Sequence, residues 1–71
     1  MKQEYIKEFN GNILGILETD DNGNQTARDF PSYRILGYYN KQLNRTTTFF
    51  GQIVSSGNTV VQFIYQAKQG K

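Results

Sequence analysis

A short segment recurs three times along the chain, and this repeat constrains the fold more than any other sequence feature. Residues 9–15 align with residues 49–55 without a gap, and both segments read Phe-x-Gly-(Asn/Gln)-Ile-(Leu/Val). A third copy, residues 30–37, has one extra residue between its Phe and its Ile. The Phe residues of the three copies are 21 and 19 residues apart, which is too short for paired-helix repeats and suits two strands with two turns.

The residues that fill each repeat favour β-strands. Segments 13–18 and 35–40 are rich in β-branched, aromatic and leucine residues, and each is followed by turn-forming residues. The dipeptide Asn22-Gly23 favours a type I′ hairpin turn. Return strands are expected at residues 25–30, 45–50 and 59–65, and a further short strand is expected at residues 5–9. No window shows sustained helical periodicity with caps, so helix is a minor element at most. The sequence therefore predicts an all-β antiparallel meander of about three repeated hairpins.

Apolar side chains are expected on both faces of this sheet. In residues 35–40, strict alternation directs Ile35 and Tyr39 to one face and Leu36 to the other. A single sheet with one solvated face would not carry this pattern. Two solutions stay open: the meander curls into a small barrel with Gly15 and Gly37 at bends, or it packs on a second molecule.

The size of the chain favours the second molecule. Seventy-one residues make one domain, which we place at residues 1–71 with an ordered core at about 5–66 and a polar tail at 67–71. Three Val, six Ile, four Leu and five Phe form a thin core for one domain. We therefore expect self-association, most simply as a homodimer.

Composition excludes several kinds of chemistry. The chain has no Cys and no His, which removes disulfides, thiolate nucleophiles, imidazole bases and the usual zinc, haem and iron–sulfur ligands. No apolar run is long enough to span a membrane, and the first residues open no signal peptide. We expect a soluble cytoplasmic protein with no cofactor, no bound metal and no membrane partner.

Charge is divided unevenly along the chain. Residues 1–30 carry three bases and all six acids, for a net charge of −3, whereas residues 31–71 carry five bases and no acid, for +5. This asymmetry indicates either two halves that attract each other, within one chain or across a dimer, or a basic surface for a polyanion such as nucleic acid.

Other candidate chemistry has simpler interpretations. Asp20-x-Asn22-x-Asn24 resembles the start of a calcium loop, but the Gly and Glu that should follow are absent, so a polar hairpin turn is the preferred interpretation. Thr46-Thr47-Thr48 lacks a base placed by any known motif, and threonine runs suit strands. We expect the protein not to be an enzyme.

The repeat also supports a resemblance to known proteins. The stretch Asp29-Phe30 with Tyr33-Arg34-Ile35-Leu36-Gly37-Tyr38-Tyr39 resembles a group of short bacterial proteins, of no known activity, that repeat Asp-Phe-Tyr-Gly-Arg-Ile-Leu-Gly-Tyr-Tyr. The similarity covers roughly residues 9–55 and departs from the motif at Pro31-Ser32, Gln52 and Ser55. It implies a hairpin-repeat β fold and nothing about activity.

Two functions remain open. The preferred one is a small interaction protein that self-associates through its sheet and engages a protein partner. The alternative is a β domain that binds single-stranded nucleic acid, since basic and aromatic residues interleave in the second half of the chain. For either function the candidate contact residues are Arg34, Tyr38, Tyr39, Lys41, Arg45 and Phe63.

Overall fold

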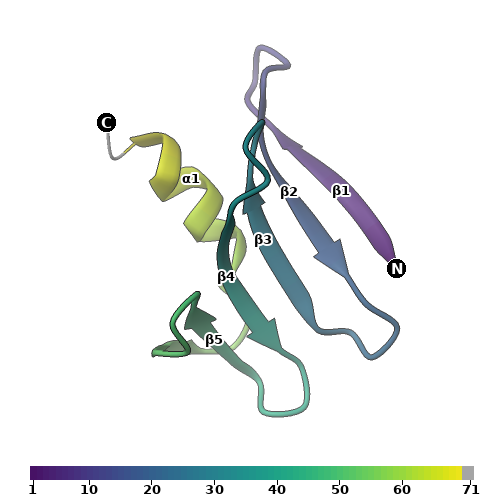
Figure 1. The fold of residues 1–71 in the computed structure, drawn as a ribbon, viewed down its shortest axis with the longest axis vertical. Coiled ribbons are helices and arrows are strands. Elements are labelled where there is room, and N and C mark those ends of the chain that lie inside the picture. Colours follow the sequence, from purple (N-terminus) through teal and green to yellow (C-terminus); the bar gives the residue numbers. More distant parts are fainter. Residues whose placement is uncertain (70–71) are drawn as a thin grey trace.

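The computed structural model of the protein describes residues 1–69, which form one antiparallel sheet and one helix (Figure 1). The strands are β1 (Lys2–Lys7), β2 (Ile13–Thr19), β3 (Gln25–Asp29), β4 (Ile35–Asn40), β5 (Arg45–Thr48) and β6 (Ile53–Ser56), and the helix is α1 (Val61–Gln69). Every strand pairs with its neighbours in the sequence, so the order across the sheet is β1-β2-β3-β4-β5-β6. The predicted β-meander is confirmed.

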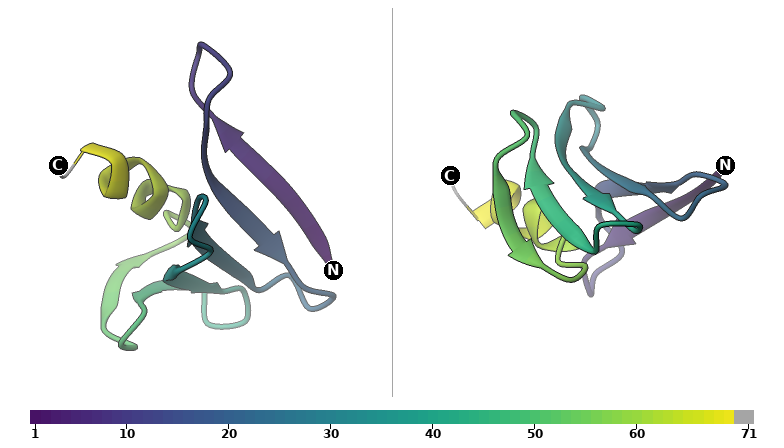
Figure 2. Two further views of the ribbon diagram at one scale, coloured as in Figure 1. Left: turned by 45° about the horizontal axis from the view of Figure 1, so that its top comes forward. Right: turned by 90° about the horizontal axis from the view of Figure 1, so that it is seen from below.

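The sheet is curled but open. In the described residues β1 and β6 do not pair with each other and form the two edges of the sheet. The strands twist and bend so that α1 lies against one face (Figure 2). In the described residues the meander therefore curls without closing into the small barrel that was one of the two predicted solutions.

The helix α1 replaces the last predicted return strand, residues 59–65, so that prediction is wrong. Val60 and Ile64 are fully buried, whereas Gln62 and Tyr65 are exposed, and this burial follows the helical period of 3.6 residues. The helix has nine residues. Within residues 1–69 no helix is long and apolar enough to cross a membrane. Residues 67–69, predicted as the start of a polar tail, belong to α1, and residues 70 and 71 lie outside the described residues.

The first and last copies of the repeat form matching turns between strands. Glu8 donates its backbone N–H to the Asn12 carbonyl between β1 and β2, and Thr48 donates to the Gln52 carbonyl between β5 and β6, each over 2.8 Å. The repeated residues therefore specify the connection between one strand and the next.

One residue in each of these turns has a left-handed backbone. φ is +93° at Gly11 and +86° at Gly51, a conformation that glycine adopts without steric penalty. In the middle copy, which is one residue longer, Tyr33 takes this conformation with φ +63°. At the Asn22-Gly23 turn Gly23 has φ +87° while Asn22 does not have a positive φ, so the predicted type I′ turn, which needs both, is wrong.

A β-bulge follows each of the three turns, at the second apolar residue of the repeat. The strand registers skip one residue at Leu14, Leu36 and Val54. Leu14 belongs to the buried core and Leu36 packs against it, so the bulges direct both side chains toward α1. The strict alternation predicted for residues 35–40 fails at Leu36 for this reason.

Two glycines let α1 approach the sheet closely. A Cβ on Gly15 would lie 2.7 Å from Cγ2 of Ile64, and a Cβ on Gly37 would overlap the ring of Phe63. Neither glycine has a positive φ, so the missing side chain, and not backbone freedom, is what each position requires. Gly15 and Gly37, predicted at bends, directly follow the bulges at Leu14 and Leu36 and also form the surface on which the helix packs.

A buried threonine joins the sheet to the start of α1. Thr46 on β5 is fully buried, and its Oγ1 donates to the Gly57 carbonyl (2.7 Å) and accepts the Thr59 N–H (3.0 Å). Both partners lie in the connection between β6 and α1. The hydroxyl therefore satisfies two backbone groups that the turn into the helix would leave unpaired.

An ion pair holds the far end of α1. Lys68 Nζ lies 3.1 Å from Asp29 Oδ1 and also donates to the Phe30 carbonyl over 2.8 Å. Partial burial favours the neutral form of Asp29, but the hydrogen bonds from Lys68 and Ser32 outweigh it, so the pKa of Asp29 lies below its usual value. This pair links the acidic first half of the chain to the basic second half.

Replacing Thr46 by Val should lower the free energy of unfolding by about 1–3 kcal/mol, because the Gly57 carbonyl and the Thr59 N–H lose their partner at an unchanged side-chain shape. Urea denaturation followed by circular dichroism measures the effect. Thr47→Val, on the same strand but on the face away from α1, is the matched control and should change the stability by less than about 0.5 kcal/mol. Equal losses in the two variants would contradict the role given to Thr46.

Adding a methyl group at Gly37 should destabilise the fold by about 1–3 kcal/mol, because the Gly37→Ala side chain overlaps Phe63 and displaces α1. Shortening the opposing side chain with Phe63→Leu in the same protein should recover part of this loss. A double-mutant cycle on the unfolding free energies checks it. If the stability losses of the two single variants simply add in the double variant, the contact between Gly37 and Phe63 is not the cause of the destabilisation.

The Asp29–Lys68 pair should make stability depend on pH in the acidic range. The folded pKa of Asp29 lies below the unfolded value of about 3.9, so its stabilisation is complete well above that pH and is lost as the pH falls through the folded pKa. Asp29→Asn should therefore cost about 1 kcal/mol at pH 7 and nothing in strong acid. Denaturation at a series of pH values tests this, with Glu8→Gln, an exposed acid, as the control. A constant cost at all pH values would contradict the assignment.

Candidate functional site

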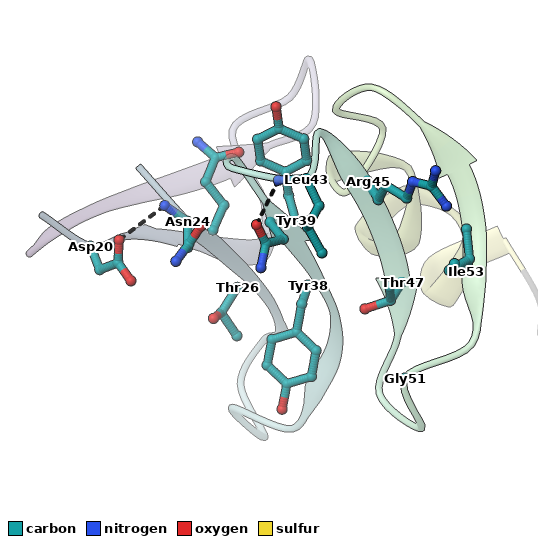
Figure 3. A pocket seen from close by; sticks show the side chains of 12 residues that line it. Asp20, Asn24, Thr26, Tyr38, Tyr39, Leu43, Arg45, Thr47, Gly51 and Ile53 are labelled. Carbon is teal, nitrogen blue, oxygen red and sulfur yellow. Dashed lines mark hydrogen bonds between the residues drawn. The ribbon is translucent and has the colours of Figure 1, made fainter. Parts of the chain in front are cut away.

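Three of the six candidate contact residues line one groove. Tyr38, Tyr39 and Arg45 belong to the lining of a groove of about 750 Å³ that extends across β3, β4, β5 and β6 (Figure 3). Tyr38 follows Gly37, which faces α1, so the Tyr38 side chain projects from the opposite face of the sheet. The groove therefore lies on the face that the helix leaves uncovered.

The other three candidates lie elsewhere. Lys41 sits in the β4–β5 turn, where its backbone N–H donates to Asn24 Oδ1 over 2.9 Å, but it does not line the groove. Arg34 is exposed in the connection before β4. Phe63 packs on Gly37 from α1, on the opposite face of the sheet from Tyr38. The structure thus brings three of the six residues together in the groove and places the other three at separate positions outside it.

The floor of the groove is a row of side chains on adjacent strands. Thr26 on β3 pairs with Tyr38 on β4, Tyr38 pairs with Thr47 on β5, and Thr47 pairs with Ile53 on β6. Residues paired in this way lie on the same face of a sheet. Figure 3 shows Thr26, Tyr38 and Thr47 with no hydrogen bond among themselves or to the other lining residues. Three hydroxyl groups and one apolar side chain are therefore available along this row.

The groove end near the β2–β3 turn uses its polar groups internally. Asp20 Oδ1 accepts the backbone N–H of Asn22 and of Asn24, each over 2.9 Å. Asn40 Oδ1 likewise accepts the N–H of Leu43 over 3.0 Å. These bonds confirm the interpretation of residues 20–24 as a polar hairpin turn. Within residues 1–69 no group of three or more acidic residues is placed to hold a metal ion.

Arg45 brings an unpaired positive charge to the groove. Its side chain is exposed, and no carboxylate of the described residues lies within 4.0 Å of it. Figure 3 places it on the opposite side of the groove from Asp20. Arg45 pairs across the β4–β5 ladder with Asn40, which is neutral. The guanidinium is therefore available to an anion from outside the chain.

Arg28 differs from Arg45 because its guanidinium is already bound. Its Nε donates to Glu18 Oε1 over 2.8 Å, and Nη1 donates to the Tyr33 carbonyl over 3.0 Å. The hydrogen bond from Arg28 lowers the pKa of Glu18, partial burial opposes the change, and a bond from Gln3 adds to the lowering. This network stabilises the β2–β3 pair and leaves no free cation there.

Exposed apolar side chains gather at the other edge of the same region. Phe50 is 90% exposed, and Phe49, Ile53 and Val54 are each more than half exposed. We call these four residues the β6 edge patch. They lie on the last strand of the sheet and on the turn that leads into it.

A second groove, of about 690 Å³, lies between the β1–β2 turn and α1. Phe9, Leu14 and Tyr65 contribute its apolar surface, with Lys7 and Lys68 among its polar lining. Lys68 is held there by its ion pair with Asp29. None of the six candidate residues lines this groove.

Sequence reasoning did not identify Thr26, Thr47 or Ile53 as groove residues. Each is ordinary in the sequence and reaches Tyr38 only through the register of β3, β5 and β6. The repeated turns set the β3–β4 and β5–β6 registers and the turn at residues 41–44 sets the β4–β5 register, so pairing the strands outward from these turns would have found the row. The interleaving of aromatic and basic residues, by contrast, predicted Tyr38 and Arg45 directly.

Comparison with known proteins found no matching family model, no matching curated protein and no matching solved structure. The resemblance to the short bacterial repeat proteins therefore stays a prediction.

Proposed function

We propose that the protein is a non-enzymatic interaction protein that self-associates through the β6 edge of its sheet and engages a protein partner. The observation that carries the proposal is the β6 edge patch, where Phe50 is 90% exposed and Ile53 57% exposed beside an open strand edge. Exposed apolar side chains grouped on one turn and its strand are typical of interaction sites. We place this role in the cytoplasm, in keeping with a chain without Cys.

The two edges of the sheet differ in how they are protected. β1 carries Lys2, Glu4 and Lys7, and charged side chains discourage the addition of another strand. β6 reads Ile-Val-Ser-Ser and carries no charge. An incoming strand therefore meets no charge at β6, although this edge is only four residues long and carries the bulge at Val54.

A second copy fits the β6 edge by symmetry. Two β6 strands that pair antiparallel about a two-fold axis would supply hydrogen-bond partners to the outward backbone groups of both. Ile53 and Val54 of the two copies would then lie next to each other and lose their exposure to water. A strand of a different protein could add to the same edge through the same backbone bonds, which is how we expect a protein partner to bind.

Placing a charge in the β6 edge patch should abolish self-association. We expect the unmodified protein to have twice the 8.2 kDa chain mass at low micromolar concentration, and Val54→Lys to have the mass of one chain. Size-exclusion chromatography with light scattering measures both. Phe9→Lys is the matched control, because Phe9 is a fully exposed apolar residue in the equivalent turn of the first repeat.

Two results would overturn the proposal. A single-chain mass for the unmodified protein would exclude self-association at this concentration. Equal dissociation of the Val54→Lys and Phe9→Lys variants would show that the contact does not lie at β6. Circular dichroism of each variant establishes that the fold is retained.

A further inference from the structure

We propose that the groove on the face away from α1 binds a nucleotide unit, with the base on Tyr38 and the phosphate on Arg45. The shared chemistry is a heteroaromatic ring joined to a phosphate, which both single-stranded nucleic acid and a free nucleotide present. This site lies within one chain and goes beyond the proposed self-association.

The floor of the groove suits a base. Tyr38 stands on β4 between Thr26 and Thr47, the short side chains of the neighbouring strands. An aromatic side chain on a sheet face is a common platform on which bases stack. The two threonine hydroxyls flank this platform and can donate to or accept from the edge of a stacked base.

Arg45 lies close enough to Tyr38 to bind the phosphate of a nucleotide whose base stacks on Tyr38. It is two residues from Thr47 on β5 and therefore a diagonal neighbour of Tyr38, at roughly 7–8 Å between backbones. Its long side chain can cover that distance, so the guanidinium can reach the phosphate of a nucleotide whose base stacks on Tyr38. A guanidinium binds phosphate oxygens in a bidentate manner, which fixes direction as well as charge.

The Arg45 side of the groove favours an anion. Asp20 is the one acidic residue in the groove lining, and its Oδ1 is held by two backbone N–H groups on the opposite side from Arg45. The remaining lining residues are neutral. An acidic peptide would satisfy Arg45 but would leave the Tyr38 platform unused, whereas a nucleotide engages both.

Fluorescence anisotropy with a labelled eight-residue oligothymidylate tests the site, and thymidine 5′-monophosphate followed by NMR tests the free nucleotide. We expect Tyr38→Ala to weaken oligonucleotide binding about tenfold and Tyr38→Phe, which keeps the ring, to retain most of it. Arg45→Gln should weaken binding and lower the magnitude of the salt slope by about 0.7, the value for one phosphate contact on a single strand. The tighter of the two probes identifies the source of the nucleotide.

Arg34→Gln is the matched control, because Arg34 is also exposed but does not line the groove. Its binding and salt slope should remain near those of the unmodified protein. The proposal is overturned if neither probe binds at 50 mM salt. It is equally overturned if Arg34→Gln weakens binding as much as Arg45→Gln does, since that result indicates a diffuse charge effect.

The Val54→Lys variant separates this inference from the proposed self-association. Val54 does not line the groove, so a single-chain Val54→Lys protein should bind both probes as the unmodified protein does. Loss of binding in that variant would show that the site needs two copies and would overturn a groove within one chain.

Discussion

The close packing of α1 on two glycines determines how the rest of the molecule is arranged. Ile64 and Phe63 lie over Gly15 and Gly37, at distances that a single extra methyl group would prevent. The helix therefore covers one face of β2, β3 and β4, and Ile64 of the helix together with Val60 just before it makes up half of the buried core cluster. The apolar side chains are divided among this core, the groove and the fully buried Ile16, which belongs to neither, and the sheet stays open.

The repeated segment encodes curvature as well as connection. Each copy combines a turn that contains a left-handed residue with a bulge at its second apolar residue, at Leu14, Leu36 and Val54. A bulge bends its strand and increases the local twist. The three bulges lie in the β1–β2, β3–β4 and β5–β6 pairs, and together they bend the sheet around α1. A short motif repeated along the chain thus sets the overall shape, although its Phe residues contribute little to the core.

The secondary structure could be predicted where local residue preferences determine it, and could not be predicted where packing against distant residues determines it. Residues 35–40 form a strand with the predicted bounds because turn residues flank a β-favouring run on both sides. Residues 61–65 of the predicted strand 59–65 form the start of a helix. Over so few positions a strand and a helix bury overlapping sets of apolar residues, and contact with the sheet face favours the helix. Tyr38 and Arg45 were visible as an aromatic and a cation, whereas Thr26 and Thr47 gain importance only from strand register.

The order of the elements along the chain has a consequence for synthesis. All strand pairs join neighbours in sequence, so the meander needs no distant segment to form its ladders. The helix that covers it comes last, after β6. During translation from the N-terminus the sheet face around Ala27 stays open to water until residues 60–64 emerge. Because the covering residues come after all six strands, the sheet can pair before its core face is covered, and residues 60–64 then cover that face.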